Sequence, residues 1–166
     1  MKIALLSIAA LASLACPASA QPPATGLIGI TRAVALAERH LSGQALDAEL
    51  ENDGGRLYYE IDLVKAGKPW EVRIDARTGR VLAGVAASAW WGWMQRGDAG
   101  HAARSRPLSG ILSNWERRSG GRVTDVGFDV EGGRARYEIE IETRAGVAEL
   151  HVDPRTGNRL TNVYDD

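Results

Sequence analysis

The chain has 166 residues, of which 45% are hydrophobic and 25% charged, with one cysteine and a formal net charge of −1 at pH 7. These values are ordinary for a soluble globular protein and exclude a collagen, a coiled coil, a disulfide scaffold and wholesale disorder. A net charge close to zero also argues against nucleic-acid binding, which normally requires a basic face.

The first 20 residues predict a secretory signal peptide. Lys2 precedes an apolar run over residues 3–15, and the small-x-small cleavage site Ala18-Ser19-Ala20 follows it. Cleavage after Ala20 would give a periplasmic or secreted protein, and no apolar run in the chain has the length of a membrane span. Lipidation at Cys16 is the less favoured alternative, because the three residues before it match a lipoprotein signal poorly.

The remainder of the chain contains an internal repeat. A shift of 78 residues aligns residues 30–82 with residues 108–160 without a gap, and sixteen of the 53 aligned positions are identical. Self-similarity of this kind indicates copies of one supersecondary unit. We therefore predict repeat 1 at residues 27–84 and repeat 2 at residues 107–164, joined by a tryptophan-rich linker at residues 85–106.

Each repeat is predicted to begin with a helix, because apolar residues recur at helical spacing over residues 30–41 and 108–115. Thr31 and Ser109 stand at equivalent positions, and their hydroxyl groups are expected to cap the helix N-termini. Glycine tolerates the left-handed conformation that ends many helices. The expected stops are Gly43 and Gly120-Gly121.

The rest of each repeat alternates apolar and polar residues in three segments, which are separated by turns that contain glycine. Such alternation predicts antiparallel strands with one buried and one solvated face. The expected fold class is α+β, with two tandem α-β-β-β units, each one helix packed on a three-stranded antiparallel sheet.

The most recognisable motif of the repeat is Asp-x-Arg-Thr-Gly. We interpret it as a structural turn, because an aspartate carboxylate can accept the N–H groups of the next residues while glycine adopts a positive φ. A calcium loop is excluded by ligand number, since neither copy offers a second carboxylate within the turn. The residues expected to form these turns are Asp75, Thr78 and Gly79, and Asp153, Thr156 and Gly157.

These features resemble the PepSY domain family. The resemblance is carried by the helix opening Ile30-Thr31-x-x-Val34, the strand centre Tyr59-Glu60-Ile61 and the closing segment Ile74-Asp75-Ala76-x-Thr78-Gly79-x-Val81-Leu82. Repeat 2 departs from the pattern at Pro154, which replaces the small residue after the aspartate. The resemblance implies a non-enzymatic module that binds or restrains peptidases, or acts in the cell envelope, and it implies no catalytic residues.

The sequence also lacks the usual motifs of an enzyme. His40, His101 and His151 do not show the spacing of metal ligands, and the chain has no nucleophile elbow and no phosphate-binding loop. We therefore predict no catalytic activity, no cofactor and no metal site.

The first candidate partner-binding feature is a cluster of tryptophans in the linker, formed by Trp90, Trp91 and Trp93. Three interpretations are open. The indoles could fill the seam between the repeats, anchor a protein partner as interface hot spots do, or lie at a membrane interface.

The second candidate feature is the solvated face of each predicted sheet. Its acidic part in repeat 2 could steer a basic partner, although strand faces that are merely solvated have the same composition. The candidates are Tyr58, Glu60, Asp62 and Arg73 in repeat 1, and Glu138, Glu140 and Glu142 in repeat 2.

The sequence thus predicts an exported, non-catalytic protein-binding module that inhibits or regulates a peptidase of the cell envelope. The alternative is a structural or sensory envelope module that contacts lipid or a membrane partner through the tryptophan-rich linker. The expected partner is another protein, with a peptidase as the first candidate, and no nucleic acid is expected.

Overall fold

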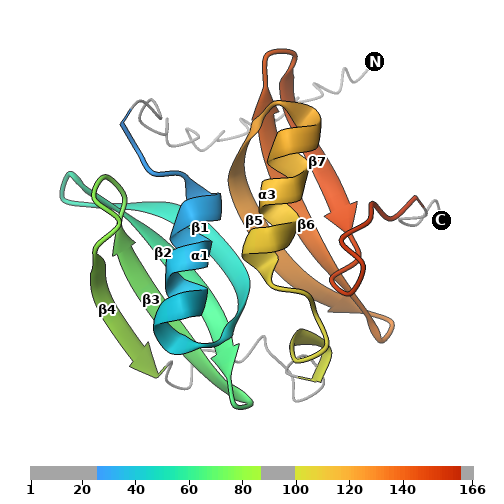
Figure 1. Cartoon of the computed structure of the whole chain (residues 1–166), viewed down its shortest axis with the longest axis horizontal. Coiled ribbons are helices and arrows are strands. Elements are labelled where there is room, and N and C mark those ends of the chain that lie inside the picture. Colours follow the sequence, from blue (N-terminus) through green and yellow to red (C-terminus); the bar gives the residue numbers. More distant parts are fainter. Residues whose placement is uncertain (1–25, 87–99, 162–166) are drawn as a thin grey trace, which may run out of the picture.

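The computed structural model describes residues 26–86 and 100–161. Two helices and seven strands make up its named elements (Figure 1). In chain order they are α1 (Ile30–Leu41), β1 (Gln44–Asp53), β2 (Arg56–Lys65), β3 (Lys68–Asp75), β4 (Val81–Ala86), α3 (Leu108–Ser119), β5 (Arg122–Glu131), β6 (Arg134–Thr143) and β7 (Gly146–Val152). Each repeat supplies a helix followed by three antiparallel strands, and repeat 1 adds the fourth strand β4. This arrangement confirms the predicted α+β fold class.

The strands of both repeats join into one antiparallel sheet with the order β4-β3-β2-β1-β5-β6-β7. The junction between the repeats is the pairing of β1 with β5, in which Ala48 stands opposite Val126. Both of these side chains are fully buried. The alternating pattern did not specify this junction, because it determines which face of a strand is buried and not which strand becomes its neighbour.

Repeat 1 carries a strand that the pattern did not predict. After the turn that follows Asp75, β4 pairs with β3 from Val81 to Ala86, two residues beyond the predicted end of the repeat. Repeat 2 holds only the start of this strand among the described residues, an isolated bridge between Val152 and Arg159. The three-stranded unit is therefore extended at the outer edge of repeat 1.

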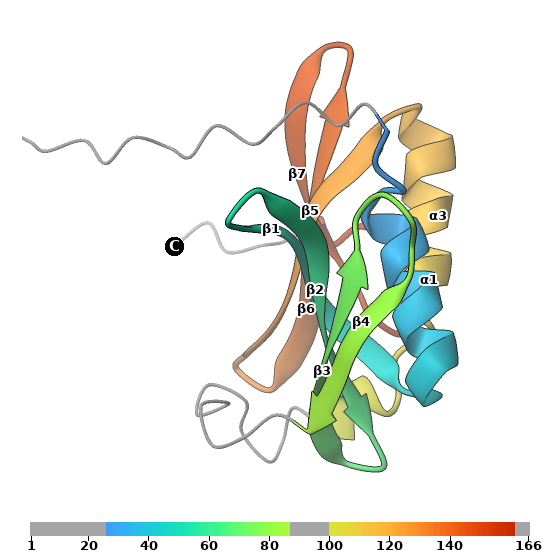
Figure 2. The ribbon, with the colours of Figure 1, turned by 90° about the vertical axis from the view of Figure 1, so that its left-hand side faces the viewer.

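Both helices lie on the same face of the sheet, with α1 over repeat 1 and α3 over repeat 2 (Figure 2). Their apolar stripes are buried against the strands as the helical spacing predicts, and one continuous core spans both repeats. The buried helix residues are Ile30, Ala33, Val34, Ala37 and Leu41 in α1, and Leu108, Ile111, Leu112 and Trp115 in α3.

The prediction that Thr31 and Ser109 cap the helices is wrong. The N-cap positions are Gly29 and Pro107, two residues earlier, so both side chains lie inside the first turn and neither helix has a side-chain cap of its own. The start of α3 is capped instead by Glu38 of α1, which accepts hydrogen bonds from Leu108 N at 2.9 Å and Ser109 Oγ at 2.5 Å. The carboxylate of one repeat thus satisfies the helix of the other.

The predicted helix stops are correct in repeat 2 and displaced by one residue in repeat 1. Gly120 adopts the left-handed conformation after α3, whereas Ser42, not Gly43, adopts it after α1. Gly43 and its counterpart Gly121 serve a different purpose. A Cβ at Gly121 would lie 2.5 Å from a β6 carbonyl oxygen, and one at Gly43 would lie 3.0 Å from a β2 carbonyl oxygen. The chain therefore needs glycine here so that the turn can pass close to the sheet.

Candidate functional site: the open face of the sheet

The candidate site is the face of the sheet opposite the two helices, which we call the open face (Figure 2). Successive side chains of a strand point to opposite faces, so the residues between the core positions project here. Acidic side chains predominate among them. They are Asp47, Glu49, Glu51, Tyr58, Glu60, Asp62, Glu71 and Arg73 in repeat 1, and Asp125, Asp129, Arg136, Glu138, Glu140, Glu142, Glu149 and His151 in repeat 2.

The structure brings the predicted sheet residues of both repeats onto this one surface. Tyr58, Glu60 and Asp62 project from β2, and β3 places Arg73 directly opposite Glu60. The three glutamates of β6 project from the same face of the other repeat. The two predicted patches are therefore parts of one continuous face, because β1 and β5 join the sheets between them.

The centre of this face consists of acidic residues on β1 and β5, which were not among the predicted site residues. Asp47, Glu49 and Asp125 lie between the two predicted patches. One signal was present, since Asp47 and Asp125 occupy the same repeat position and are identical. Their importance depends on the β1–β5 junction, which the alternation does not specify.

In repeat 1 a single arginine neutralises part of the open face. Arg73 Nε lies 3.0 Å from Glu60 Oε2 and 2.9 Å from Glu71 Oε1. Its guanidinium also stacks over the ring of Tyr58, 5.2 Å from the centroid. Glu60 and Glu71 share this arginine. Asp62, which lies on β2 opposite Glu71, has no ion pair with a cation among the described residues.

Asp47 and Asp62 face each other across β1 and β2. Burial, followed by the negative charges of neighbouring carboxylates, raises the pKa of both side chains from 3.8 to about 7. Asp62 Oδ1 is buried with no hydrogen-bond partner in the described part of the chain. Ionised carboxylates in this position are costly, so the pair is suited to accept a proton or an external cation.

In repeat 2 the charges on and beside the open face are more evenly balanced. Arg136 lies 2.8 Å from Asp129 Oδ2 and 3.0 Å from both Glu131 Oε2 and Glu138 Oε1. His151 Nε2 lies 2.9 Å from Glu149 Oε1. Further along β6, Glu140 and Glu142 are exposed to solvent. Negative charge is thus accessible near the far end of β6, away from the arginine.

The Asp-x-Arg-Thr-Gly turns have the same geometry in both repeats. Asp75 Oδ1 accepts hydrogen bonds from Thr78 N at 2.9 Å and Thr78 Oγ1 at 2.8 Å, and these bonds lower the pKa of Asp75. Asp153 Oδ1 accepts the equivalent bonds from Thr156 at 2.8 and 3.1 Å. The glycines that end the turns have φ near 75°, so these carboxylates are engaged locally.

The tryptophan cluster, the other predicted binding feature, lies outside the described residues. Trp90, Trp91 and Trp93 fall in the interval 87–99, between β4 and the short helical segment at residues 100–102. Their proposed contacts remain predictions.

A match to a known protein-family model shows which family the chain belongs to. The model of the peptidase propeptide and YPEB domain, PepSY, matches residues 27–84 and 112–160. The chain belongs to the PepSY family. Each match covers a helix, or the latter part of one, and the strands that follow it, so the resemblance seen in the sequence is confirmed.

Two individual proteins are similar to this PepSY chain. The uncharacterized protein YkoJ of Bacillus subtilis (strain 168) is 24% identical over 135 residues, which is 81% of this chain and 73% of YkoJ. The crystal structure of a "putative lipoprotein" from Clostridium difficile 630 is 18% identical and covers 81% of this chain and 92% of its own, with a TM-score of 0.43.

Two further properties bear on the chemistry of the chain. Within residues 26–86 and 100–161, no group of three or more His, Cys, Asp or Glu side chains is arranged to hold a metal ion. No helix in the same ranges is long and apolar enough to cross a membrane. The absence of catalysis and of a cofactor remains a prediction from the sequence.

Proposed function

We propose that this PepSY protein is an exported, non-catalytic module that binds another protein through the open face of its sheet, with a peptidase as the first candidate partner. The observation that supports the proposal is the open face itself, a surface that neither α1 nor α3 covers and on which, among the described residues, carboxylates outnumber cations. The family description, which includes peptidase propeptides, favours a peptidase over other basic proteins.

The open face has suitable dimensions for a protein interface. Seven strands about 4.8 Å apart span roughly 30 Å, and the four ten-residue strands β1, β2, β5 and β6 are roughly 30 Å long at about 3.3 Å per residue, so the face covers at most roughly 900 Å². This area is comparable to the roughly 800 Å² that each partner buries in a standard protein interface. A partner of ordinary size can therefore cover both repeats at once.

The charges favour a basic partner. Asp47 and Asp62 lie side by side with raised pKa values, and one Asp62 oxygen has no hydrogen-bond partner among residues 26–86 and 100–161. A lysine or arginine from a partner would supply the missing counter-charge, and the surrounding acidic field would speed the encounter. The binding is expected to weaken with salt, because exposed charges are screened.

The proposal is tested by affinity capture. Mature protein, starting at residue 21, is immobilised and exposed to an envelope extract of its own organism at several salt concentrations. We expect one protein to be retained at low salt and released as salt rises. The retained protein is identified by mass spectrometry and, if it is a peptidase, assayed with and without the PepSY protein.

A pair of variants separates the open face from the rest of the surface. Glu140→Gln removes one negative charge from the open face, and Asn114→Lys makes the same change in net charge on α3, on the helix side of the sheet. We expect Glu140→Gln to weaken capture and Asn114→Lys to leave it unchanged. The proposal would be contradicted if the two variants retained the same amount of partner as each other, or if no protein were retained at any salt concentration.

A further inference from the structure

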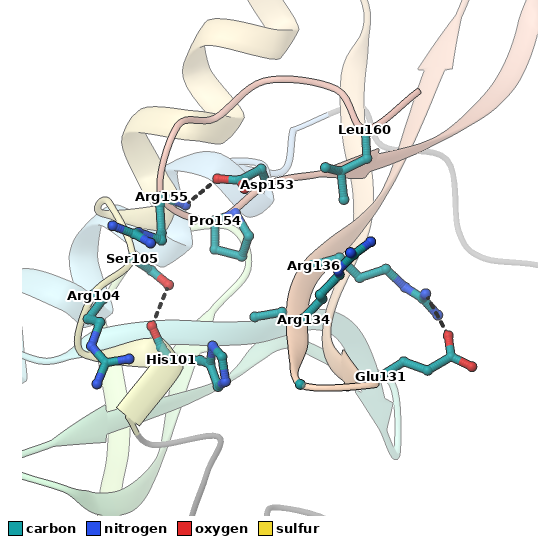
Figure 3. Close-up of a pocket in the computed structure, with 12 residues that line it drawn as sticks. His101, Arg104, Ser105, Glu131, Arg134, Arg136, Asp153, Pro154, Arg155 and Leu160 are labelled. Carbon is teal, nitrogen blue, oxygen red and sulfur yellow. Dashed lines mark hydrogen bonds and ion pairs between the residues drawn. The ribbon is translucent and has the colours of Figure 1, made fainter. Parts of the chain in front are cut away.

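A cavity on repeat 2 has the opposite charge to the open face. Its volume is about 280 Å³, and three chain segments surround it: the helical turn and loop at residues 101–105, the β5–β6 hairpin at 131–136, and the turn that begins at Asp153 (Figure 3). We call this cavity the arginine pocket. It lies where the segment before α3, a hairpin and the second Asp-x-Arg-Thr-Gly turn meet.

The arginine pocket has an excess of positive charge. Arg104, Arg134, Arg136 and Arg155 line it, together with the carboxylates of Glu131 and Asp153. Both carboxylates are already engaged. Glu131 pairs with Arg136 at 3.0 Å, and Asp153 accepts the backbone N–H of Arg155 at 2.9 Å.

The other three arginines keep their charge available. Arg104, Arg134 and Arg155 are exposed, and no carboxylate of the described residues forms an ion pair with them. Guanidinium groups bind carboxylates and phosphates through two parallel hydrogen bonds. An anion that enters the pocket therefore finds donors that no group of the described chain has used.

One wall of the arginine pocket is apolar. Ala135, Pro154 and Leu160 contribute it, and Pro154 is buried. A site that combines unpaired guanidinium groups with an aliphatic wall favours an organic anion over an inorganic one, because the apolar part of the ligand gains burial as well. A cavity of about 280 Å³ suits a single small residue better than an extended chain.

The repeat supplies an internal comparison. Arg134 and Arg155 have counterparts in repeat 1, Arg56 and Arg77, which stand 78 residues earlier. Arg104 does not, because its equivalent position is Gly26. The correspondence holds in the structure, since Ile28 N and Arg106 N donate equivalent hydrogen bonds to Ala76 O and Pro154 O.

The same comparison applies to Arg136, which corresponds to Tyr58 in repeat 1. Two of the four arginines of the pocket are thus specific to repeat 2. The PepSY fold itself does not require them, since repeat 1 adopts the same fold without them.

We propose that the arginine pocket binds a carboxylate attached to a small apolar group. Such a ligand is offered by the C-terminal residue of a polypeptide or by a free small carboxylic acid. The carboxylate pairs with Arg134 and with the other two available arginines, Arg104 and Arg155. The apolar group lies against Pro154 and Leu160. This pocket lies beside the open face and shares only Arg136 with it, and the proposal does not depend on the function of that face.

Isothermal titration calorimetry of the mature protein tests the proposal. The probes are N-acetyl-leucine, its uncharged amide, and a hexapeptide of five alanines and a C-terminal leucine, with a free or an amidated end. We expect N-acetyl-leucine to bind at least about tenfold more tightly than its amide, because a charge-assisted pair is lost. Tighter binding of the free-ended peptide would identify a polypeptide as the source, and equal or weaker binding a small acid.

Matched variants locate the site. Arg134→Ala is expected to weaken N-acetyl-leucine binding at least about tenfold, whereas Arg56→Ala, at the same position of repeat 1, leaves it unchanged. Glu140→Gln on the open face also leaves it unchanged, which separates this test from that of the proposed function. Equal affinities for acid and amide, or equal losses in the two arginine variants, would overturn the proposal.

Discussion

The contact between Glu38 and the start of α3 gives the sharpest prediction for stability. Replacing Glu38 by alanine removes the acceptor for Leu108 N at 2.9 Å and Ser109 Oγ at 2.5 Å, together with a weak contact to Ser109 N at 3.4 Å. Two bonds of good geometry to a charged group are lost, while the third is too long to count for much. The N–H groups at the helix start are then left without a protein partner.

The magnitude follows from these bonds. Loss of an N-cap costs typically about 1 kcal/mol, and a hydrogen bond to a charged group contributes about 1.5–3 kcal/mol. Since water can reach the half-buried site and replace part of the interaction, we expect Glu38→Ala to lower the free energy of unfolding by about 2–3 kcal/mol. Glu38→Gln, which keeps one acceptor oxygen, should lose about half as much.

Urea unfolding followed by circular dichroism at 222 nm measures the effect. Glu116→Ala is the matched control, because Glu116 occupies the same position in repeat 2 but accepts only Val123 N, at 3.0 Å, within its own repeat. We expect it to cost about 1 kcal/mol. The reasoning is refuted if Glu38→Ala stays within about 0.5 kcal/mol of the wild type or costs no more than Glu116→Ala.

Three further predictions concern pH, packing and processing. The pKa values of Asp47 and Asp62 are about 7 in the folded protein, compared with 3.8 for an ordinary aspartate carboxyl group. Between about pH 4 and pH 7 the folded state therefore binds more protons than the unfolded state. The free energy of unfolding should fall as pH rises through that window. Gly121→Ala should lower the free energy of unfolding by about 1–3 kcal/mol through overpacking. Gly43→Ala should lower it by less, because a Cβ at Gly121 would lie nearer to a carbonyl oxygen than a Cβ at Gly43 would. Intact-mass measurement of the exported protein should show a chain that begins at residue 21.

Calorimetry, urea unfolding and intact-mass measurement test these three predictions in turn. Calorimetric melting temperatures from pH 5 to 8 should decline less steeply for Asp62→Asn than for the wild type, and equal slopes would remove Asp62 from the explanation. Equal urea midpoints for the two glycine variants would show that the turn of repeat 2 relaxes at no cost. A mass that includes a lipid on Cys16 would replace signal cleavage after Ala20 by lipoprotein processing.

The sequence predicted those parts of the fold that depend on local periodicity. The buried stripe of α1 and the inward and outward alternation of β2 both follow from the spacing of apolar residues. The helix starts were harder to predict, because Thr31 and Ser109 have the right chemistry for a cap but each lies two residues after the N-cap position of its helix. The actual cap comes from Glu38, 70 residues before Leu108, and no local pattern indicates a partner at that distance.

The candidate site, too, was predictable only where it depends on local alternation. Alternation placed Glu60 and Glu138 on solvated faces, and the structure has them there. It could not show that the two faces are one, because that depends on β1 meeting β5. The raised pKa of Asp47 depends on the same assembly, since burial and the carboxylates of both repeats contribute to it.

The pairing between β1 and β5 has a consequence for the symmetry of the molecule. Ala48 and Val126 are separated by 78 residues and so occupy the same place in the two repeats. Antiparallel pairing of equivalent residues relates the halves by a two-fold axis, as in a symmetric homodimer. An isolated half would carry a self-complementary edge and could pair with a second copy only at sufficient concentration, whereas one chain that holds both halves forms this pairing at any concentration. The symmetry is not complete, because only one of the two equivalent glutamates contacts the helix of the opposite half.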